Sequence, residues 1–304
     1  MKDLIPAIDK GILKKELNQK RFIKNTRKGG NEIYIINGNN SPNTMNEIGR
    51  LREITFRLAG GGTGESIDVD AADFGEHCYE QLIVWSPEDE EIIGGYRFIC
   101  CEKAIDEKSN KIHLSTANYF NFSDNFIKQY LPNTIELGRS WIQPNFQGAN
   151  NARKGLFALD NIWDGLGALI QLNPKHLYFF GKVTMYPSYN IECRDFLLHF
   201  MHYYFPDNEK LMHPHNPIAQ NYNKLLFDEE LKGLSFSEGI KKLNAYIRER
   251  GEFIPPLVNI YMNLSPSMKT FGTALNSEFG NVEETGIMVT IKDIYPEKKE
   301  RHMS

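Results

Sequence analysis

Hydrophobic side chains recur along this chain in short runs broken by polar residues, a pattern typical of β-strands with a buried face. Two such runs, residues 81–86 and 91–101, are separated by the polar segment Pro87-Glu88-Asp89-Glu90. This arrangement predicts a β-hairpin. The other runs that predict strands are residues 32–36, 134–144, 176–185, 268–275 and 286–294.

Longer amphipathic segments predict helices between these strands. The first helix is expected to start at Ser41-Pro42 and to run through Phe56, until the glycines at 60, 61, 62 and 64 break it. Two further helices are predicted at residues 151–170 and 188–204.

The last third of the chain begins with residues 205–234, which are rich in Asn, Pro and His, and we expect long loops there. Ser235 and Glu238 then form a capping box for a helix that ends near Arg250. Hairpin strands come first and helices are interleaved later. This order favours an α+β fold with a mixed sheet over a doubly wound one.

The segment 134–144 reads as a buried strand that carries two charges in its middle. Such charges are costly unless they are paired or used. In a regular strand, Glu136 and Arg139 point to opposite faces, but Gly138 between them permits a β-bulge that turns both toward one site. We therefore expect chemistry at this strand.

A run of acidic residues, Asp68-Val69-Asp70-Ala71-Ala72-Asp73, has no matching positive charge close to it in the sequence. It is a solvated turn, a calcium-like loop or one half of an ion-pair network. An EF-hand is excluded, because its twelve-residue pattern is absent. Arg52, Arg97 and Arg139 each lie within an otherwise apolar element. Several such charges predict a buried network with Asp70 and Asp73.

Two other patterns give weaker signals. The glycine-rich segment 60–64 lacks the Lys-Ser/Thr of a P-loop, so we interpret it as a flexible loop. Asp195, His199 and His202 fall on one helix face with a spacing that suits a metal site. This spacing is common, and we interpret these residues as ordinary structural ones and expect no metal.

Composition places the 304 residues among ordinary globular proteins, with 41% hydrophobic and 24% charged residues. The formal net charge of -4 gives no overall attraction to nucleic acid or anionic lipid. The four cysteines form no CxxC pair and are expected to be reduced. No secretion signal and no apolar run of roughly 20 residues is present, so a cytoplasmic protein is expected.

The basic segment 14–28 is the one local exception to this charge balance, and contact with the inner face of a membrane is a minority interpretation of it.

Four motifs occur in a specific order along the chain. They are Arg52-x-x-x-Phe56, Asp70-x-x-Asp73, Gly95-Tyr96-Arg97 and Glu136-Leu137-Gly138-Arg139. This order resembles the acyl-homoserine lactone synthases. It resembles still more their hemolysin-like relatives, which N-acylate amino acids to make ornithine and glycine lipids. Both groups belong to the GNAT N-acyltransferase superfamily. The segments 254–261 and 279–291 extend the resemblance, which covers roughly residues 32–295.

The resemblance implies a GNAT-like α+β fold with a mainly antiparallel sheet flanked by helices. It divides the chain into a basic N-terminal arm (1–30), a GNAT-like acyltransferase core (31–204) and a C-terminal extension (205–304) that completes the same domain. The implied reaction moves a fatty acyl group from an acyl carrier protein thioester to the amine of glycine or ornithine, in aminolipid synthesis.

Two alternatives stay open: a non-catalytic acyl-carrier or lipid-binding protein of the same fold, and an acyl-homoserine lactone type signal synthase. The second is disfavoured because the segment with Pro255-Pro256 fits the lipid enzymes better.

The resemblance also assigns roles to residues. Glu136 is the candidate base, and either Arg97 or Arg139 is expected to bind the acceptor's carboxylate. The remaining arginine is expected to join an ionic scaffold. Aromatic residues are expected to line an acyl tunnel: Phe98, Trp141, Phe146 and Phe157. The full set expected around the substrate is Arg52, Phe56, Asp70, Asp73, Arg97, Arg139 and Trp141.

The donor is expected to be an acyl-phosphopantetheine that acts as a co-substrate, with no resident cofactor and no nucleic-acid partner. Ile142, Gln147, Gly148 and Asn151 are the candidate donor-binding residues, near a bulge and at the start of a helix. The superfamily's pyrophosphate motif is met only loosely by Gln147-Gly148-Ala149. We therefore expect acyl carrier protein, rather than coenzyme A, as the partner.

Overall fold

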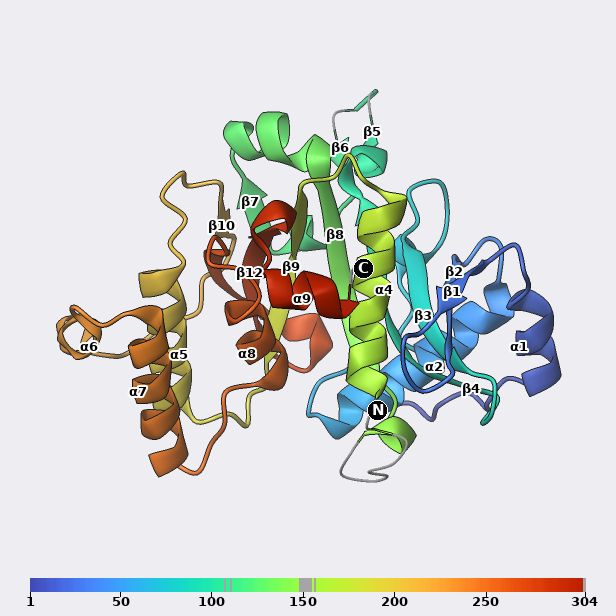
Figure 1. The fold of residues 1–304 in the computed structure, drawn as a ribbon, viewed down its shortest axis with the longest axis horizontal. Helices are drawn as coiled ribbons and strands as arrows, with labels where there is room; N and C mark the ends of the chain where they lie inside the picture. The colour runs from blue at the N-terminus through green and yellow to red at the C-terminus, as the bar shows by residue number, and fades with distance from the viewer. Residues whose placement is uncertain (107, 110, 148–154, 156, 303–304) are drawn as a thin grey trace.

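A computed structural model of the protein describes all residues except 107, 110, 148–154, 156, 303 and 304 (Figure 1). Among the described residues, the main sheet has eight strands in the order β1-β2-β3-β4-β8-β9-β12-β11. In chain order these strands are β1 (Phe22–Asn25), β2 (Glu32–Ile36), β3 (Glu80–Ser86), β4 (Glu91–Cys100), β8 (Thr134–Ile142), β9 (Tyr178–Met185), β11 (Lys269–Asn276) and β12 (Val282–Thr290).

Neighbouring strands of this sheet are antiparallel except for β8 and β9, which run parallel. Four short strands form two small separate ribbons: β5 (Ile105–Asp106) with β6 (Lys111–Ile112), and β7 (Phe120–Phe122) with β10 (Met212–Pro214). The α+β prediction with a mainly antiparallel sheet is confirmed.

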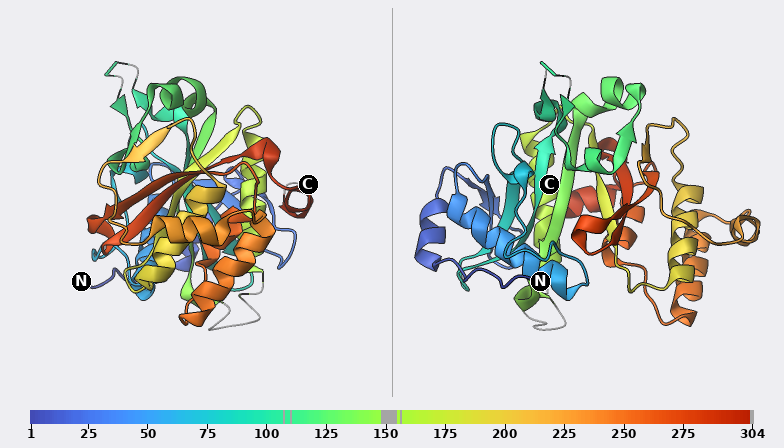
Figure 2. Two further views of the ribbon diagram at one scale, coloured as in Figure 1. Left: turned by 90° about the vertical axis from the view of Figure 1, so that its left-hand side faces the viewer. Right: turned by 180° about the vertical axis from the view of Figure 1, so that it is seen from behind.

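Helices cover both faces of the sheet (Figures 1 and 2). They are α1 (Lys10–Glu16), α2 (Pro42–Leu58), α4 (Ala158–Leu172), α5 (Ile191–Tyr204), α6 (Lys224–Leu231), α7 (Phe236–Glu249), α8 (Pro256–Met262) and α9 (Pro296–His302). Helix α2 lies on one face, and α4 crosses the other face in front of β8 (Figures 1 and 2). No helix of the described ranges is both long and apolar enough to cross a membrane.

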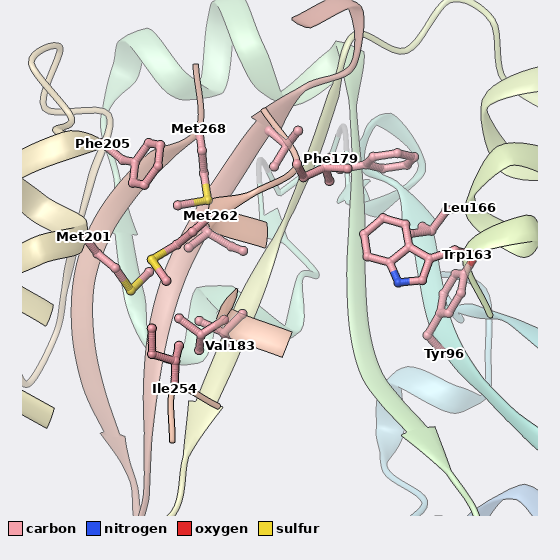
Figure 3. Packing of buried hydrophobic residues seen from close by; sticks show 14 of the residues in the cluster. Tyr96, Trp163, Leu166, Phe179, Val183, Met201, Phe205, Ile254, Met262 and Met268 are labelled. Atoms are coloured by element: carbon pink, nitrogen blue, oxygen red, sulfur yellow. The ribbon is translucent and has the colours of Figure 1, made fainter. Parts of the chain in front are cut away.

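Successive side chains along the strands point to opposite faces of the sheet, and they form a separate hydrophobic cluster on each face. On β3, Leu82 and Val84 belong to the cluster that contains the buried face of α4, whereas Ile83 and Trp85 belong to the cluster under α2. This period of two is what a strand covered on both faces requires. Figure 3 shows Tyr96, Trp163, Leu166 and Phe179 gathered on the α4 side of β8.

Most predicted elements are confirmed within a few residues. The strand at residues 32–36 and the β3–β4 hairpin are present, and Ser235 and Glu238 form the expected capping box at the start of α7. The four cysteines are free thiols. The N-terminal segment contributes the edge strand β1 to the main sheet.

Two predictions were wrong in detail, and one helix was missed. Residues 205–234 hold β10 and α6 where loops were expected, because only Phe227 and Leu231 of this short helix are buried and give a weak periodic signal. Helix α8 was not predicted. Strand β12 begins at Val282, earlier than the predicted start at 286, because the buried Glu284 reads in the sequence as a solvated charge.

The predicted bulge in β8 is confirmed, although the strained residue differs. Gly95 of β4 faces Trp141, and Arg97 faces Gly138, so that Arg139 and Ser140 together oppose one residue. Arg139 is the residue with a left-handed backbone, at φ 50°. The extra residue shifts the side-chain alternation, so Trp141 packs in the cluster under α2.

The close pairing of β4 and β8 leaves room for a side chain at some glycines of these strands and not at others. A Cβ at Gly94 would overlap the carbonyl oxygen of Trp141 on the neighbouring strand, while a Cβ at Gly138 would meet only ordinary contacts, the nearest at 3.8 Å. We expect Gly94→Ala to lower the free energy of unfolding by about 1–3 kcal/mol, as overpacked sites do. The matched control Gly138→Ala should change it by less than about 0.5 kcal/mol. Urea unfolding followed by circular dichroism measures both, and equal losses would contradict the assignment.

Candidate active site

The parallel strands β8 and β9 diverge partway along their length. Their pairing covers only Thr134 to Leu137 against Tyr178 to Gly181, and the bulge at Arg139 follows directly. Beyond Gly181, β9 continues to pair with β12 on its other side. A wedge therefore opens in the sheet between β8 and β9.

An apolar cavity of about 310 Å³ occupies this wedge. On the α4 side its walls include Ile162, Trp163 and Leu166, and helix α8 adds Leu257 and Tyr261. From the α2 side, Phe56 and Phe279 line the same cavity. The cavity therefore passes between the two faces of the sheet, and its walls suit a hydrocarbon chain.

A polar cavity of about 560 Å³ adjoins the wedge. Its lining includes Asp70, Arg97, Ser115 and Tyr119. Three residues line both cavities: Arg139, Lys182 and Phe279. The boundary between an apolar and a polar compartment thus lies at two cationic side chains and one aromatic ring.

The predicted ion-pair network is confirmed next to the polar cavity. Arg97 Nη1 lies 2.8 Å from Asp70 Oδ1 and 3.4 Å from Asp73 Oδ2, and Arg52 Nη1 lies 3.5 Å from Asp73 Oδ1. Arg52, Asp73 and Arg97 are buried, and Gln81 donates to Asp73 at 2.9 Å. Arg97 is therefore held inside the scaffold.

The scaffold also sets the charge state of Asp70. Burial raises the pKa of this carboxyl, but the charge of Arg97 and its hydrogen bond outweigh burial and lower the pKa to about 2. Asp70 and Asp73 further form a capping box at the short helical turn Ala71–Asp73, which fixes the acidic segment against the sheet.

Arg139 differs from Arg97 because it lines both cavities, whereas Arg97 lines only the polar one. Its Nε lies 2.8 Å from Asp68 Oδ2, its Nη2 lies 3.8 Å from Asp70 Oδ2, and its guanidinium stacks over the ring of Phe279 at 4.3 Å. Asp68 and Asp70 thus engage the Nε–Nη2 edge of the guanidinium, and Arg139 lines both cavities.

Glu136 is fully buried, and its partners are hydroxyl groups and not Arg139. Its carboxylate accepts hydrogen bonds from the hydroxyls of Tyr79 at 2.9 Å, Ser115 at 2.8 Å and Thr116 at 2.8 Å. Ser115 lines the polar cavity, while Glu136 lies behind it and is not among the residues that line either cavity. The bulge brings Glu136 and Arg139 to the same side of the sheet, but hydroxyl groups, and not the guanidinium, stabilise this carboxylate.

Lys182 and Glu284 form a second buried ion pair that the sequence analysis missed. The Lys182 Nζ lies 2.5 Å from Glu284 Oε2 and 4.0 Å from the centre of the Tyr119 ring. Asn276 donates to the other carboxylate oxygen at 3.0 Å. The sequence gives one signal for this pair: each of the two strands carries a charge at an inward position. Only the fold shows that β9 and β12 are neighbours.

The remaining predicted residues fall in several places. Phe56 lines the apolar cavity, whereas Trp141, Phe98 and Phe146 pack in the hydrophobic clusters and, like Phe157, are absent from the cavity walls. The aromatic residues that do line it were mostly not predicted: Tyr96, Trp163, Phe179, Phe180, Tyr186, Tyr261 and Phe279.

The described part of the chain includes only two of the four predicted donor-binding residues, Ile142 and Gln147. The side chain of Gln147 donates to the carbonyl of Ile142 at 2.7 Å, at the end of β8. Gly148 and Asn151 lie outside the described residues, as does much of the predicted start of the helix at 151.

Among the described residues, one group has the ligand types of a metal site: Cys100, Glu102 and His176. These side chains already bond to neighbours. His176 Nε2 lies 2.9 Å from Glu102, Lys175 Nζ lies 2.8 Å from Glu102, and Cys100 donates to Asn173. Asp195 and His199 are likewise engaged, with Arg194 and Asp228.

Comparison with known proteins identifies relatives of the whole chain. A family model described as acetyltransferase (GNAT) domain matches residues 51–154. A glycine N(alpha)-acyltransferase of Phocaeicola vulgatus is 49% identical over 303 residues, which cover 100% of this chain and 93% of that protein. A glycine N(alpha)-acyltransferase of Bacteroides thetaiotaomicron is 51% identical over 307 residues, covering 100% and 90%. No solved structure gives a significant match.

The ionic scaffold predicts a large effect of Asp73→Asn. The variant leaves the fully buried Arg52 without its carboxylate partner. Removing one partner of a buried pair typically costs about 3–5 kcal/mol. The double variant Arg52→Met/Asp73→Asn should lose less than the sum of the two single losses, by roughly 0.5–3 kcal/mol. Asp124→Asn, in an exposed pair with Lys128, is the matched control and should be nearly neutral in urea unfolding. Additive losses would show that Arg52 and Asp73 do not act as one network.

Proposed function

The chain belongs to the GNAT family of N-acyltransferases, and we propose that it transfers a fatty acyl group from acyl carrier protein to the α-amine of glycine. The product is an N-acylglycine, the simplest aminolipid. Both relatives, which are about half identical to this chain, are named glycine N(alpha)-acyltransferase. Their name supports glycine over ornithine as the acceptor. The observation that carries the proposal is the junction of an apolar and a polar cavity at Arg139, Lys182 and Phe279.

The two cavities suit the two substrates of such a reaction. The fatty acyl chain is apolar and would enter the wedge between β8 and β9, with the extended pantetheine arm leading to its opening. Glycine is a small zwitterion and fits the polar cavity. The thioester carbon then lies at the boundary, and holding both reactants there supplies much of the catalysis. Backbone N–H groups near the bulge would bind the thioester oxygen.

Arg139 is the proposed anchor for the carboxylate of glycine. The two candidates were Arg97 and Arg139, and Arg97 is already engaged by Asp70 and Asp73 inside the scaffold. Arg139 lines both cavities, and its Nε is the atom closest to Asp68. Its outer nitrogens would bind the carboxylate with both N–H groups of the fork.

Glycine reaches the enzyme mainly as an ammonium ion, which must lose a proton before it can attack. Glu136 is the proposed base for this first proton, which it receives through the Ser115 hydroxyl that lines the polar cavity. The Ser115 oxygen takes a proton from the ammonium while its own proton passes to Glu136, 2.8 Å away.

An acceptor panel tests the proposed function. The purified protein is incubated with palmitoyl-acyl carrier protein and a set of amines: glycine, alanine, ornithine and glycinamide. Mass spectrometry should detect N-palmitoylglycine as the main product, formed faster than the product from palmitoyl-coenzyme A. Ornithine as the preferred acceptor, or coenzyme A as the better donor, would contradict that part of the proposal.

Arg139→Gln tests the carboxylate anchor. A charged hydrogen bond contributes about 1.5–3 kcal/mol, so kcat/KM for glycine should fall about 10- to 100-fold. Glycinamide has no carboxylate, and its kcat/KM should change little. The glycine-to-glycinamide ratio is the measurement because a general loss of stability lowers both rates alike. An unchanged ratio would assign Arg139 to the scaffold alone.

Glu136→Gln and Ser115→Ala test the base. Loss of a general base costs about 10²–10⁴-fold in rate, so both variants should acylate glycine that much more slowly near neutral pH. Raising the pH should restore part of the rate, because more of the amine is then neutral. Aminooxyacetate keeps the carboxylate but has a neutral amine at pH 7, and its acylation should be nearly unaffected. Equal losses with glycine and aminooxyacetate would make Glu136 a structural residue.

A further inference from the structure

The ion pair of Lys182 and Glu284 lies at the place where the two substrates meet, and the mechanism above does not use it. Lys182 sits one residue beyond the point where β9 leaves β8, and Glu284 lies diagonally across on β12. Both side chains line the apolar cavity in the wedge, and Lys182 also lines the polar one.

Stability alone gives no reason for this pair. Two charges removed from water rarely add net stability compared with well-packed apolar residues. Here Glu284 is buried and the side chain of Lys182 is only 10% exposed, and neighbouring groups hold both in place: Asn276 donates to Glu284, and the ring of Tyr119 contacts the Lys182 ammonium. A charged pair that neighbouring groups orient beside a cavity is typical of a functional site.

The reaction leaves one proton without a carrier. The neutral amine still has to lose a second proton after attack, and the departing thiolate has to gain one. Arg139 cannot serve, because a guanidinium does not give up its proton in proteins. Glu136 lies behind Ser115 on the polar side and away from the wedge that holds the thioester.

We infer that Lys182 and Glu284 form a proton shuttle that carries this second proton from the attacking nitrogen to the leaving sulfur. The inference rests on the proposed function. In this role Glu284 accepts from the nitrogen and Lys182 donates to the sulfur, and both are catalytic residues that the sequence motifs do not include.

The bonds and charges balance in this step. The amine attacks the thioester carbon, a C–N bond forms, and the carbonyl oxygen takes up the electron pair. Glu284 then accepts a proton from the positively charged nitrogen. The carbonyl re-forms, the C–S bond breaks, and the sulfur leaves with the electron pair and takes a proton from Lys182. The proton on Glu284 then crosses the 2.5 Å contact to Lys182 and restores the ion pair.

The environment of Lys182 suits a donor. Burial lowers the pKa of this ammonium despite the opposing charge of Glu284, so that it gives up its proton more readily than an exposed lysine does. The other charged groups around it are Arg139, which acts in the same direction as burial, and Glu136, which opposes it.

Lys182→Arg separates a shuttle from a structural ion pair, because arginine keeps the charge but does not donate its proton. The wild type and the variants Lys182→Arg, Lys182→Met and Glu284→Gln are assayed with glycine and two palmitoyl donors. One donor is the pantetheine thioester. The other is the 4-nitrothiophenyl thioester, whose thiolate leaves without a proton. Glu283→Gln is the matched control, since Glu283 is the adjacent residue and pairs with Arg194.

With the pantetheine donor, all three variants should lose about 10²–10⁴-fold in kcat, and Arg should be no better than Met. With the aryl donor, the loss in the two Lys182 variants should shrink to less than about tenfold, while Glu284→Gln stays slow because the nitrogen still needs a base. Glu283→Gln should match the wild type with both donors, and thermal unfolding should show that every variant is folded.

Two results would overturn the inference: wild-type turnover by Lys182→Arg, or equal losses with both donors in the Lys182 variants. Failure of the proposed function is a different result, because it shows in the wild type. A wild type that acylates ornithine but not glycine contradicts the proposed acceptor, and the same variants are then compared with ornithine as the amine.

Discussion

The divergence of β8 and β9 is the constraint on which the rest of the site depends. A parallel pair within a mainly antiparallel sheet stays together for only four residues of each strand. The bulge at Arg139 and Ser140 then turns β8 away while β9 remains bonded to β12. The resulting wedge joins the α4 face to the α2 face. Substrates of opposite polarity can therefore approach from different sides and meet inside the sheet.

The bulge also decides which side chains reach this meeting point. Without it, the alternation of β8 would place Glu136 and Arg139 on opposite faces. With it, both lie on the polar side, where Arg139 binds Asp68 and Glu136 binds hydroxyl groups. The left-handed backbone at Arg139 is a strained conformation for a residue with a side chain. Such strain is found where a site needs it, and here it directs the guanidinium toward both cavities.

Sequence reasoning predicted the elements whose signals are local, and it missed contacts that depend on the fold. The hairpin, the capping box at Ser235 and the charged strand are local patterns, and the structure confirms them. The scaffold of Arg52, Asp73 and Arg97 was also predicted, because unpaired charges in apolar segments require partners. The partners of Glu136 were not predicted, since Tyr79 and Ser115 come from segments whose position no sequence pattern indicated. Lys182 and Glu284 were missed for the same reason.

The two buried charge networks differ in the chemistry they permit. Arg52 binds Asp73, and Arg97 binds Asp70 and Asp73, through guanidinium groups that do not give up their protons in proteins, so this network is suited to holding the acidic segment in place. Lysine and glutamate both exchange protons when burial perturbs them. A pair of this kind is found at the junction of the cavities, and the arginine network lies beside it. The distribution of side-chain types therefore separates a part of the site that fixes geometry from a part that can move protons.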